Sequence, residues 1–547
     1  MYEAISTSML RWATAMVPRL GGEAERTWQL PVTDIRAGRR KGLLPSVAMR
    51  WERARPWVQA VGAGVSLALA LPGPALVPLV LVVPGLLRRA LAGLRPRRAF
   101  LVGWVGGVVQ WAIAVAWVLI VLGRHGGLAW PLAVVALAIM SGILGWMWAL
   151  AATLVACVPE RWHGWLLPWL LVCLEMLQHL PPWIFPWNPV AAVATPLPWL
   201  MLPLPVVAAP GLSLLLLLAG SGLDLLLDRG YRRWGALQLA LVGLVFAAAS
   251  ALAPPFRAAG EPLVAAAVQP NVPLEVRWEP ENERMIEERV WRLSAEAAAR
   301  KATLVVWPES AVPRYLQQDG VYRQTVEGFT RRRGVWLVIG SIGFGQGEDE
   351  YFNSVFVAAP GGLVPYRYDK IHLVPFGEYL PLVGKVPFLR PLVREVSSFT
   401  PGTHALPLPA AGTTVGLQVC YEVTYPSLVA DEVRRGAELL VTITNDGWYG
   451  DSAAPRQHLA LAILRAAESR RFMVRAANTG ISAIIGPDGR VLERLGVGLE
   501  GVIQQRVQPG RGVTPAVAGF VWIRAGILLV AAGAILCGAW KRRRGTP

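Results

Sequence analysis

Long apolar stretches and one long polar block divide the chain. Residues 57–253 form a succession of apolar runs, residues 255–514 are charged and rich in turns, and a last apolar run covers 516–540. A transmembrane helix needs about 20 mostly apolar residues. By this measure we predict about eight spans, at 57–72, 74–88, 99–122, 128–157, 164–180, 205–227, 234–253 and 516–540. The pattern is typical of a polytopic α-helical membrane protein with one inserted soluble domain.

Basic residues gather beside the apolar runs and predict the orientation of the chain. Clusters of Lys and Arg occur at 88–98, 229–233 and 541–544. Such clusters are typical of the cytoplasmic side of a membrane. With the N-terminus inside and eight spans, all three lie inside and the block 255–514 lies outside. We therefore expect a multi-pass protein of the bacterial inner membrane, with its soluble domain in the periplasm.

The same pattern predicts four regions. These are a basic cytoplasmic extension at 1–55, a transmembrane region of about seven helices at 56–254, a periplasmic domain at 255–514, and a closing span with a basic tail at 515–547. Within the spans, only Glu175 is an ionisable residue deep in an apolar run. Such a residue is a functional candidate, and Glu175 either pairs with a neighbouring span or lines a site.

The polar block alternates short β-rich runs with helical stretches. Alternation of this kind favours α/β layers. Strands are predicted at 262–270, 302–310, 335–342, 352–360, 414–422, 439–446 and 481–487, and helices at 281–300, 320–333, 426–436 and 456–470.

Composition narrows the class of protein. Charged residues make up 16% of the chain and apolar residues 54%, whereas a soluble domain is about 25% charged. The net charge of +17 does not indicate nucleic-acid binding, because the basic clusters beside the spans account for much of it. Of four cysteines only Cys420 lies in the polar block, so we expect no disulfide framework there. No Cys/His spacing indicates a metal site.

Several polar residues of the block follow predicted strands directly, where active-site residues of α/β folds collect. Cys420 ends the run VGLQV at a strand-to-helix turn. A helix N-terminus there favours the thiolate and makes Cys420 a candidate nucleophile, although a buried strand cysteine is the alternative. Glu309 follows VVWP and is a candidate general base, or a turn carboxylate bound to backbone amides.

A third candidate lies in the stretch YDKIHLVPFGEYLP at 368–381. Lys370 stands there among apolar and aromatic residues, and a cation in such surroundings can stabilise a developing oxyanion. Glu378, eight residues on, is placed to orient Lys370 or a second group. The alternative for both is a surface salt bridge.

The order Glu, Lys, Cys resembles the triad of the nitrilase superfamily, whose members fold as an αββα sandwich. The chain as a whole, from about residue 55 to 540, resembles the apolipoprotein N-acyltransferase family. The motifs that carry this resemblance are WPES at 307–310, YDKIHLVPFGEYLP, VCYE at 419–422, NDGWYGDSAAPRQH at 445–458 and RAAESRRFMVRAANTG at 465–480. The extension at 1–50 is longer than the family pattern requires.

The resemblance implies a role for each matching residue. Glu309 would be the general base, Lys370 the oxyanion stabiliser and Cys420 the nucleophile. Supporting positions would be Glu378, Tyr421 and Glu422, and candidates for substrate binding are Trp278, Trp448 and Arg475. No metal and no organic cofactor are implied.

The implied reaction is a two-step acyl transfer, the last step of lipoprotein maturation. A phospholipid, phosphatidylethanolamine in the family, would acylate Cys420, and the α-amine of a lipoprotein's diacylglyceryl cysteine would discharge the thioester, with ping-pong kinetics. The apolar segment at 380–393 would dip into the interface as a lid, and the Trp-rich segment at 181–189 would add to the acyl pocket. Nothing in the sequence suggests an obligate dimer, so we expect a monomer.

Two other classes of protein fit parts of the pattern. A membrane-tethered hydrolase of the same superfamily shares the triad but uses water as acceptor, and eight spans exceed what a tether needs. A transporter or sensor with a ligand-binding outer domain predicts no dependence on Cys420, and it also predicts charged or broken spans that meet at the midplane.

Overall fold

The computed structural model describes residues 44–180, 185–277, 279–347, 350–375, 377–379 and 399–543. The chain divides into two compact units, Met1–Glu52 and Arg53–Pro547, and the description below concerns the second. Trp278, the predicted lid at 380–393 and the first residues of the segment 181–189 lie outside the described residues.

The apolar runs form helices. Three of these runs are broken: a 3-10 turn at Val77–Val82 precedes α3, α4 continues after a 62° bend through Val118–His125, and non-helical backbone at Ala208 interrupts α8. The helices are α2 (Leu44–Ala70), α3 (Val83–Leu91), α4 (Pro96–Ala114), α5 (Val118–Ile120), α6 (Trp130–Ala156), α7 (His163–Leu177), α8 (Leu204–Leu227), α9 (Arg232–Leu252) and α15 (Phe520–Arg543).

The predicted count of eight spans is not confirmed. By length and composition, four helices among the described residues are able to cross a membrane, α6, α8, α9 and α15, and α4 with its bent continuation makes a fifth. The other three fall short for physical reasons: α3 has 9 residues and α7 has 15, below the roughly 20 that a span needs. α2 is long enough, but basic and polar residues occupy its first half.

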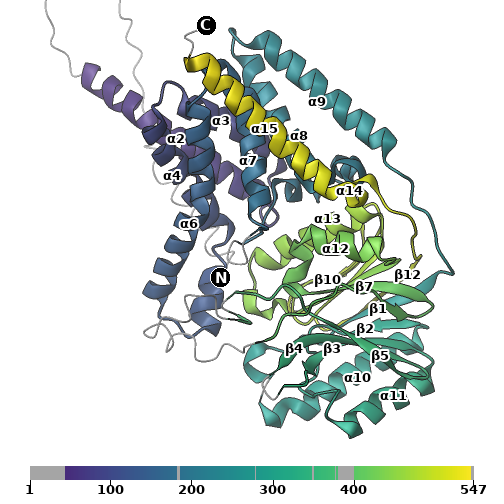
Figure 1. The fold of residues 1–547 in the computed structure, drawn as a ribbon. Helices are drawn as coiled ribbons and strands as arrows, with labels where there is room; N and C mark the ends of the chain where they lie inside the picture. The colour runs from purple at the N-terminus through teal and green to yellow at the C-terminus, as the bar shows by residue number, and fades with distance from the viewer. Residues whose placement is uncertain are drawn as a thin grey trace, which may run out of the picture. The chain divides into compact units, whose positions relative to one another are not determined.

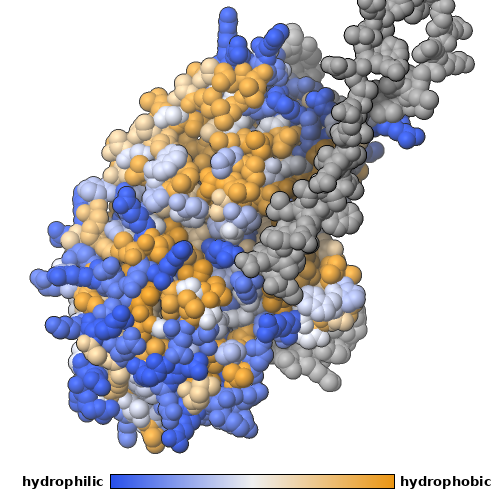
Figure 2. Space-filling view, turned by 180° about the vertical axis from the view of Figure 1, so that it is seen from behind, coloured by the Kyte–Doolittle hydropathy of each residue, from blue (hydrophilic) through white to orange (hydrophobic). Residues whose placement is uncertain are grey.

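Large apolar side chains of these helices face outward. More than half of the surface of Leu244 on α9, Ile139 on α6 and Leu529 on α15 is exposed. Figure 2 shows apolar side chains gathered over the upper part of one face and polar side chains over the lower part. Exposed apolar surface of this extent is typical of a membrane-facing protein.

The polar block folds into two six-stranded sheets (Figure 1). The first has the order β12-β1-β2-β3-β4-β5 and the second the order β11-β10-β9-β8-β7-β6. Their strands are β1 (Leu263–Gln269), β2 (Leu304–Val306), β3 (Trp336–Phe344), β4 (Tyr351–Ala359), β5 (Gly362–Asp369), β6 (Leu408–Ala410), β7 (Thr413–Val419), β8 (Leu439–Thr444), β9 (Met473–Ala477), β10 (Ser482–Ile485), β11 (Val491–Leu495) and β12 (Gly501–Val507).

The two sheets pack face to face and helices cover their outer faces. Buried residues of β1, β2, β7 and β8 form the core between the sheets. α10 (Glu283–Ala299) and α11 (Gly320–Arg333) bury an apolar stripe against the first sheet, with Val290, Leu293 and Val326 at its centre. α12 (Pro426–Arg434) and α13 (Ala454–Ser469) cover the second sheet, and α13 also packs against α8. The predicted αββα sandwich is therefore confirmed: each of the seven predicted strands and four predicted helices has a counterpart, and the structure adds β5, β6, β9, β11 and β12.

Strand direction brings several loops to one edge of the sandwich. β1, β2 and β3 run parallel, and β5 runs in the same direction because β4 is antiparallel to both of its neighbours. In the second sheet β7, β8 and β9 are parallel. The carboxyl ends of β2, β5, β7 and β8 are followed by Glu309, Lys370, Cys420 and Asn445.

Candidate active site

Glu309 and Lys370 meet in one hydrogen-bonded network. Lys370 is 1% exposed, and its Nζ lies 2.8 Å from a carboxylate oxygen of Glu378 and 3.7 Å from Oε1 of Glu309. Asn353 on β4 joins the two carboxylates, since its Nδ2 donates to Glu309 at 2.7 Å and to Glu378 at 2.8 Å. The backbone N–H of Asn445 donates to the other oxygen of Glu309 at 3.0 Å. The predicted pairing of Glu378 with Lys370 is thus present and buried, not a surface salt bridge.

Lys370 keeps its charge in this setting. Burial alone lowers the pKa of an amine, but the charges of Glu378 and Glu309 more than offset it and raise the pKa of Lys370 above its ordinary value. A permanent cation therefore sits beside Glu309 and within electrostatic reach of Cys420.

Cys420 has a strained backbone and a buried thiol. It is the first residue of a 3-10 turn, Cys420–Thr424, and its φ is +54°, in the left-handed region that L residues rarely adopt. Strain of this kind clusters at functional sites. The turn follows β7 because the Glu422 carboxylate accepts the N–H of Val419 at 2.8 Å and so ends the strand.

The expected thiolate is not the resting form of Cys420. Burial raises the pKa of its thiol, the charge of Glu309 raises it further, and Lys370 offsets only part of the increase. The helix N-terminus that we invoked lies too far along the chain, because α12 begins only at Pro426. The raised pKa favours the protonated thiol of Cys420 at neutral pH.

Glu422 ties the turn of Cys420 to the loop of Lys370. Its carboxylate accepts the hydroxyl of Tyr368 at 2.9 Å and the backbone N–H of Ile371 at 2.7 Å. Burial raises the pKa of Glu422 to about 7, against the lowering effect of these N–H donors and of Lys370. Two loops from different sheets are thus held in register by one buried side chain.

A second buried cluster contacts the backbone carbonyl of Cys420. His458 on α13 donates from Nε2 to the carbonyl oxygen of Cys420 at 3.0 Å, and its Nδ1 lies 2.9 Å from Asp446. The other Asp446 oxygen pairs with Arg475 at 2.7 Å. Arg475 keeps the pKa of Asp446 well below its usual range, against the opposing effect of burial. Arg475 is fully buried, so its partner here is Asp446 and not a surface ligand.

Aromatic rings connect the site with the apolar helical region. Tyr421 stacks on Phe185 at a centroid distance of 5.9 Å, and Phe185 stacks on Trp187 at 5.2 Å. Gln457, next to His458, accepts the indole N–H of Trp187 at 2.8 Å and of Trp117, at the bend after α4, at 3.1 Å. Trp448 lies apart from this cluster, 47% exposed and 5.7 Å from the ring of His125.

The structure gathers six of the nine sequence candidates around one centre: Glu309, Lys370, Glu378, Cys420, Tyr421 and Glu422. Arg475 lies one layer deeper and Trp448 lies at the surface.

Sequence reasoning missed Asn353 and His458. Asn353 stands at a buried position in the otherwise apolar strand FNSVFVAA, and that polar interruption was its only signal. Among the described residues no group of His, Cys, Asp or Glu is arranged to hold a metal ion.

Comparisons with known proteins show which families the chain resembles. Residues 63–222 match the family description "Apolipoprotein N-acyltransferase N-terminal domain" and residues 264–513 match "Carbon-nitrogen hydrolase". The chain is 34% identical to the apolipoprotein N-acyltransferase of Geobacter metallireducens over 84% of this chain and 90% of that protein. It is 34% identical to that of Azotobacter vinelandii over 89% of this chain and 96% of that one.

Among solved structures, an amidase from Nesterenkonia sp. AN1 is similar with a TM-score of 0.35 and 22% identity over 44% of this chain and 91% of its own. The similarity to the two acyltransferases extends across both the helical region and the sandwich. The chain therefore belongs to the apolipoprotein N-acyltransferase family.

Proposed function

We propose that this protein moves an acyl chain from a membrane phospholipid to the α-amine of the N-terminal diacylglyceryl cysteine of lipoproteins. The observation that carries the proposal is the buried juxtaposition of Glu309, Lys370 and Cys420 in a chain whose relatives are acyltransferases. The finer proposals are phosphatidylethanolamine as donor, a monomeric enzyme, and a bacterial inner-membrane location with the sandwich in the periplasm. They also include eight spans and the four regions 1–55, 56–254, 255–514 and 515–547.

In the first half-reaction Glu309 takes the thiol proton of Cys420 as the sulfur attacks the ester carbonyl. The developing oxyanion is stabilised by the Lys370 ammonium and the peptide N–H of Tyr421. Collapse breaks the ester C–O bond, and protonated Glu309 returns the proton to the leaving alkoxide. A lysophospholipid departs and a thioester remains on Cys420.

In the second half-reaction the lipoprotein amine attacks the thioester. Glu309 accepts a proton from the attacking nitrogen, the same two donors hold the oxyanion, and the C–S bond breaks. The sulfur leaves as thiolate and takes the proton back from Glu309, which restores the resting thiol. Because the pKa of the free thiol is raised, a proton donor beside the leaving sulfur is required.

The surrounding groups act through these three. Glu378 and Asn353 are proposed to hold Lys370 and Glu309 in place as an ion pair at 3.7 Å. His458 is proposed as a positioning residue, since a hydrogen bond to the carbonyl of Cys420 fixes the peptide plane and with it the N–H of Tyr421. Trp278 and Trp448 remain proposed substrate contacts, and Arg475 is proposed to act through Asp446.

The architecture suits lipid substrates. Both proposed substrates are anchored in the membrane, and the second sheet with its covering helix α13 packs directly on α8. The aromatic cluster of Phe185, Trp187 and Tyr421 places apolar surface beside the nucleophile. Attachment by helices at both ends of the sandwich keeps the thiol near the bilayer.

The test is intact-mass analysis of the purified protein after incubation with phosphatidylethanolamine. We expect a mass gain of one acyl chain that hydroxylamine removes, that Cys420→Ala abolishes, and that an apolipoprotein peptide discharges with N-acylation. Cys537→Ala, which removes an exposed cysteine, is the matched control and keeps the adduct. Release of fatty acid without transfer to the peptide would indicate a hydrolase, and absence of both adduct and turnover would refute the catalytic proposal.

A further inference from the structure

One side chain of α13 caps the broken end of α4. Gln457, which is 2% exposed, donates from Nε2 to the carbonyl oxygen of Ala114 at 2.9 Å. In an unbroken α-helix this carbonyl would accept the N–H of Val118, but after the bend Val118 donates to Val115 instead. Carbonyl groups at a helix end need another donor. The sandwich therefore supplies the hydrogen bond that the bend of α4 takes away.

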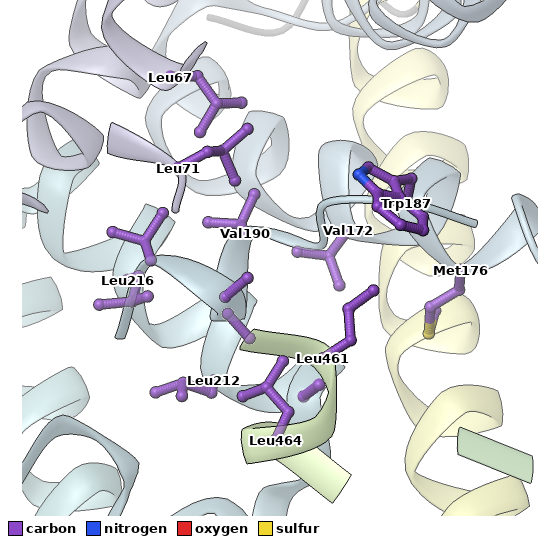
Figure 3. Packing of buried hydrophobic residues seen from close by; sticks show 14 of the residues in the cluster. Leu67, Leu71, Val172, Met176, Trp187, Val190, Leu212, Leu216, Leu461 and Leu464 are labelled. Carbon is purple, nitrogen blue, oxygen red and sulfur yellow. The ribbon is translucent and has the colours of Figure 1, made fainter. Parts of the chain in front are cut away.

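A second side chain of α13 does the same for α8. The backbone of α8 is interrupted at Ala208, whose φ is +56°. Glu468 accepts the N–H of Ala209, directly after the interruption, at 2.6 Å. Between these two polar contacts α13 packs on α8 through apolar side chains, as Figure 3 shows for Leu461, Leu464 and Leu212. α13 is thus fixed to the apolar helices near both of its ends.

The contacts of Gln457 continue to the residue that follows the nucleophile. Its Oε1 accepts the indole N–H of Trp187 at 2.8 Å. The ring of Trp187 stacks on that of Phe185, and Phe185 stacks in turn on Tyr421. One chain of contacts therefore leads from Gln457 to the side chain of Tyr421.

A second chain of contacts reaches the same peptide group from its carbonyl side. His458, the next residue along α13, donates to the carbonyl oxygen of Cys420 at 3.0 Å. That carbonyl and the N–H of Tyr421 belong to one planar peptide group. Two neighbouring residues of α13 are thus connected to this peptide group from its two sides.

Glu175 fixes the segment that carries the two stacked rings. Its carboxylate accepts the N–H of Val190 at 2.8 Å and the hydroxyl of Ser213 on α8 at 2.9 Å. Glu175 thus contacts a neighbouring helix, which is the first of its two predicted alternatives. The cavity that it lines together with Thr424 and Arg465 has room for about one water molecule.

We propose that Gln457 is a positioning residue for the oxyanion donor, through which the apolar helical region orients the peptide group between Cys420 and Tyr421. The inference rests on the proposed acyl transfer, in which the N–H of Tyr421 stabilises the oxyanion. The two chains of contacts start from neighbouring residues and end on one peptide group, so they form a closed loop. A break at any point of this loop frees the peptide group to rotate, and a donor is effective only when it points at the developing charge.

The first test replaces Gln457 by Met, which keeps the length of the side chain and removes both its donor and its acceptor. We expect thioester formation from phosphatidylethanolamine to slow about tenfold, less than for loss of the oxyanion donor itself. The KM for the lipid should stay within about twofold of the parent value, because the oxyanion forms only after the lipid has bound. Alkylation of Cys420 by iodoacetamide, which needs no oxyanion stabilisation, should stay near the parent rate.

The matched control is a buried glutamine far from the site. Gln238 on α9 donates to the carbonyl of Leu218 on α8 at 2.8 Å. Gln238→Met should lower the thermal unfolding midpoint as Gln457→Met does, because both variants remove a buried hydrogen bond to a helix. It should leave thioester formation unchanged. An equal loss of activity in the two variants would show that Gln457 acts only through stability and would overturn the inference.

A second variant tests the closed loop. Trp187→Phe keeps an aromatic ring beside Phe185 and removes the indole N–H that Gln457 accepts. We expect it to slow thioester formation by a factor similar to that of Gln457→Met. The double variant should be no slower than the slower of the two single variants, because a second break adds little once the loop is open. Effects that multiply would show that the two residues act independently and would contradict the loop.

Hydrogen exchange separates this inference from the acyl-transfer proposal. The exchange of the backbone amides of residues 420–424, followed by mass spectrometry on the full chain in detergent micelles, needs no substrate. We expect it to be several-fold faster in Gln457→Met and unchanged in Gln238→Met. If the parent chain formed no thioester while exchange responded in this way, acyl transfer would fail and the hold of Gln457 on the turn would be supported. Unchanged exchange in Gln457→Met would overturn the inference.

Discussion

Replacement of Glu309 by Gln should separate the acidity of the thiol from catalysis. Gln keeps the shape of the side chain and an oxygen that can accept from Asn353 or Asn445, but it has neither charge nor basicity. The negative charge of Glu309 is among the causes that raise the pKa of Cys420. The substitution should therefore make the thiol more acidic and acyl transfer slower at the same time.

Both effects have an expected size. Loss of a general acid–base group slows a reaction by about 10²–10⁴, which corresponds to about 3–5 kcal/mol of activation free energy. The substitution also removes the repulsion between the Glu309 carboxylate and the thiolate of Cys420, while the attraction by Lys370 stays. A loss of about 1.4 kcal/mol of repulsion would lower the thiol pKa by one unit and raise the thiolate fraction about tenfold.

The assay compares two reactions of the same sulfur. Alkylation by iodoacetamide needs a thiolate but no oxyanion stabilisation and no proton return, whereas thioester formation from phospholipid needs all three. Because the pKa of Cys420 is raised, its alkylation in the parent chain should increase about tenfold per pH unit across pH 6–9. In Glu309→Gln the whole profile should move to lower pH, while thioester formation falls at least 100-fold.

A Cys420→Ala sample subtracts alkylation of the other three cysteines. If Glu309→Gln slowed alkylation and acyl transfer equally, Glu309 would serve only to shape the site. If it left acyl transfer unchanged, Glu309 would not be the base and the proposed mechanism would fail.

The remaining predictions concern the groups around the triad. His458→Leu should slow thioester formation about 10–100-fold, less than the roughly 10²–10³-fold expected for direct loss of an oxyanion donor, and it should leave the rate of Cys420 alkylation near that of the parent chain. The side-chain amide of His458→Gln can donate to the same carbonyl, so this variant should recover most of the activity. Lack of recovery would contradict a positioning role for His458. Glu378→Gln should reduce thioester formation at least tenfold with little change in KM, because Lys370 loses its 2.8 Å partner and shifts toward Glu309; an effect on KM alone would contradict this. Gly340→Ala should lower both the thermal unfolding midpoint and activity, since the added Cβ would lie 2.8 Å from the backbone nitrogen of Ser310 and 3.0 Å from Cα of Glu309. An unchanged midpoint would show that the segment of Glu309 and Ser310 can move aside without loss of stability.

The sequence predicted the parts of the site that follow recognisable strands. Glu309 and Cys420 each lie at or close after the end of a short, mostly buried β run, and such runs are visible in the chain as mostly apolar residues. The pairing of Lys370 with Glu378 was also foreseeable, because both belong to one short stretch and carry opposite charges. The strands that went unnoticed, such as β9, either carry a charged residue or are only three to five residues long.

Contacts between distant segments could not be read from the chain in the same way. Asn353 bridges Glu309 and Glu378 across separations of 44 and 25 residues, and His458 reaches Cys420 across 38. From the sequence alone, a polar residue in a strand has many possible hydrogen-bond partners. The pairing of the strands and the packing of the sheets decide which partner lies within reach. The raised pKa of Cys420 is similarly a result of burial and of the charge of Glu309, 111 positions earlier in the chain.

By itself the sequence determined the class of this protein, an apolar helical region with an inserted α/β domain, and the residue types at the ends of its strands. These features depend on local periodicity and on hydropathy, which each segment carries independently of its neighbours. Only the tertiary structure decided that six of the candidate residues share one centre, that burial and the charge of Glu309 raise the pKa of the Cys420 thiol, and that Arg465 and Thr424 line a common cavity. Electrostatic energy and hydrogen bonding depend on distance and burial, and both are set by how the two sheets and the helices pack together.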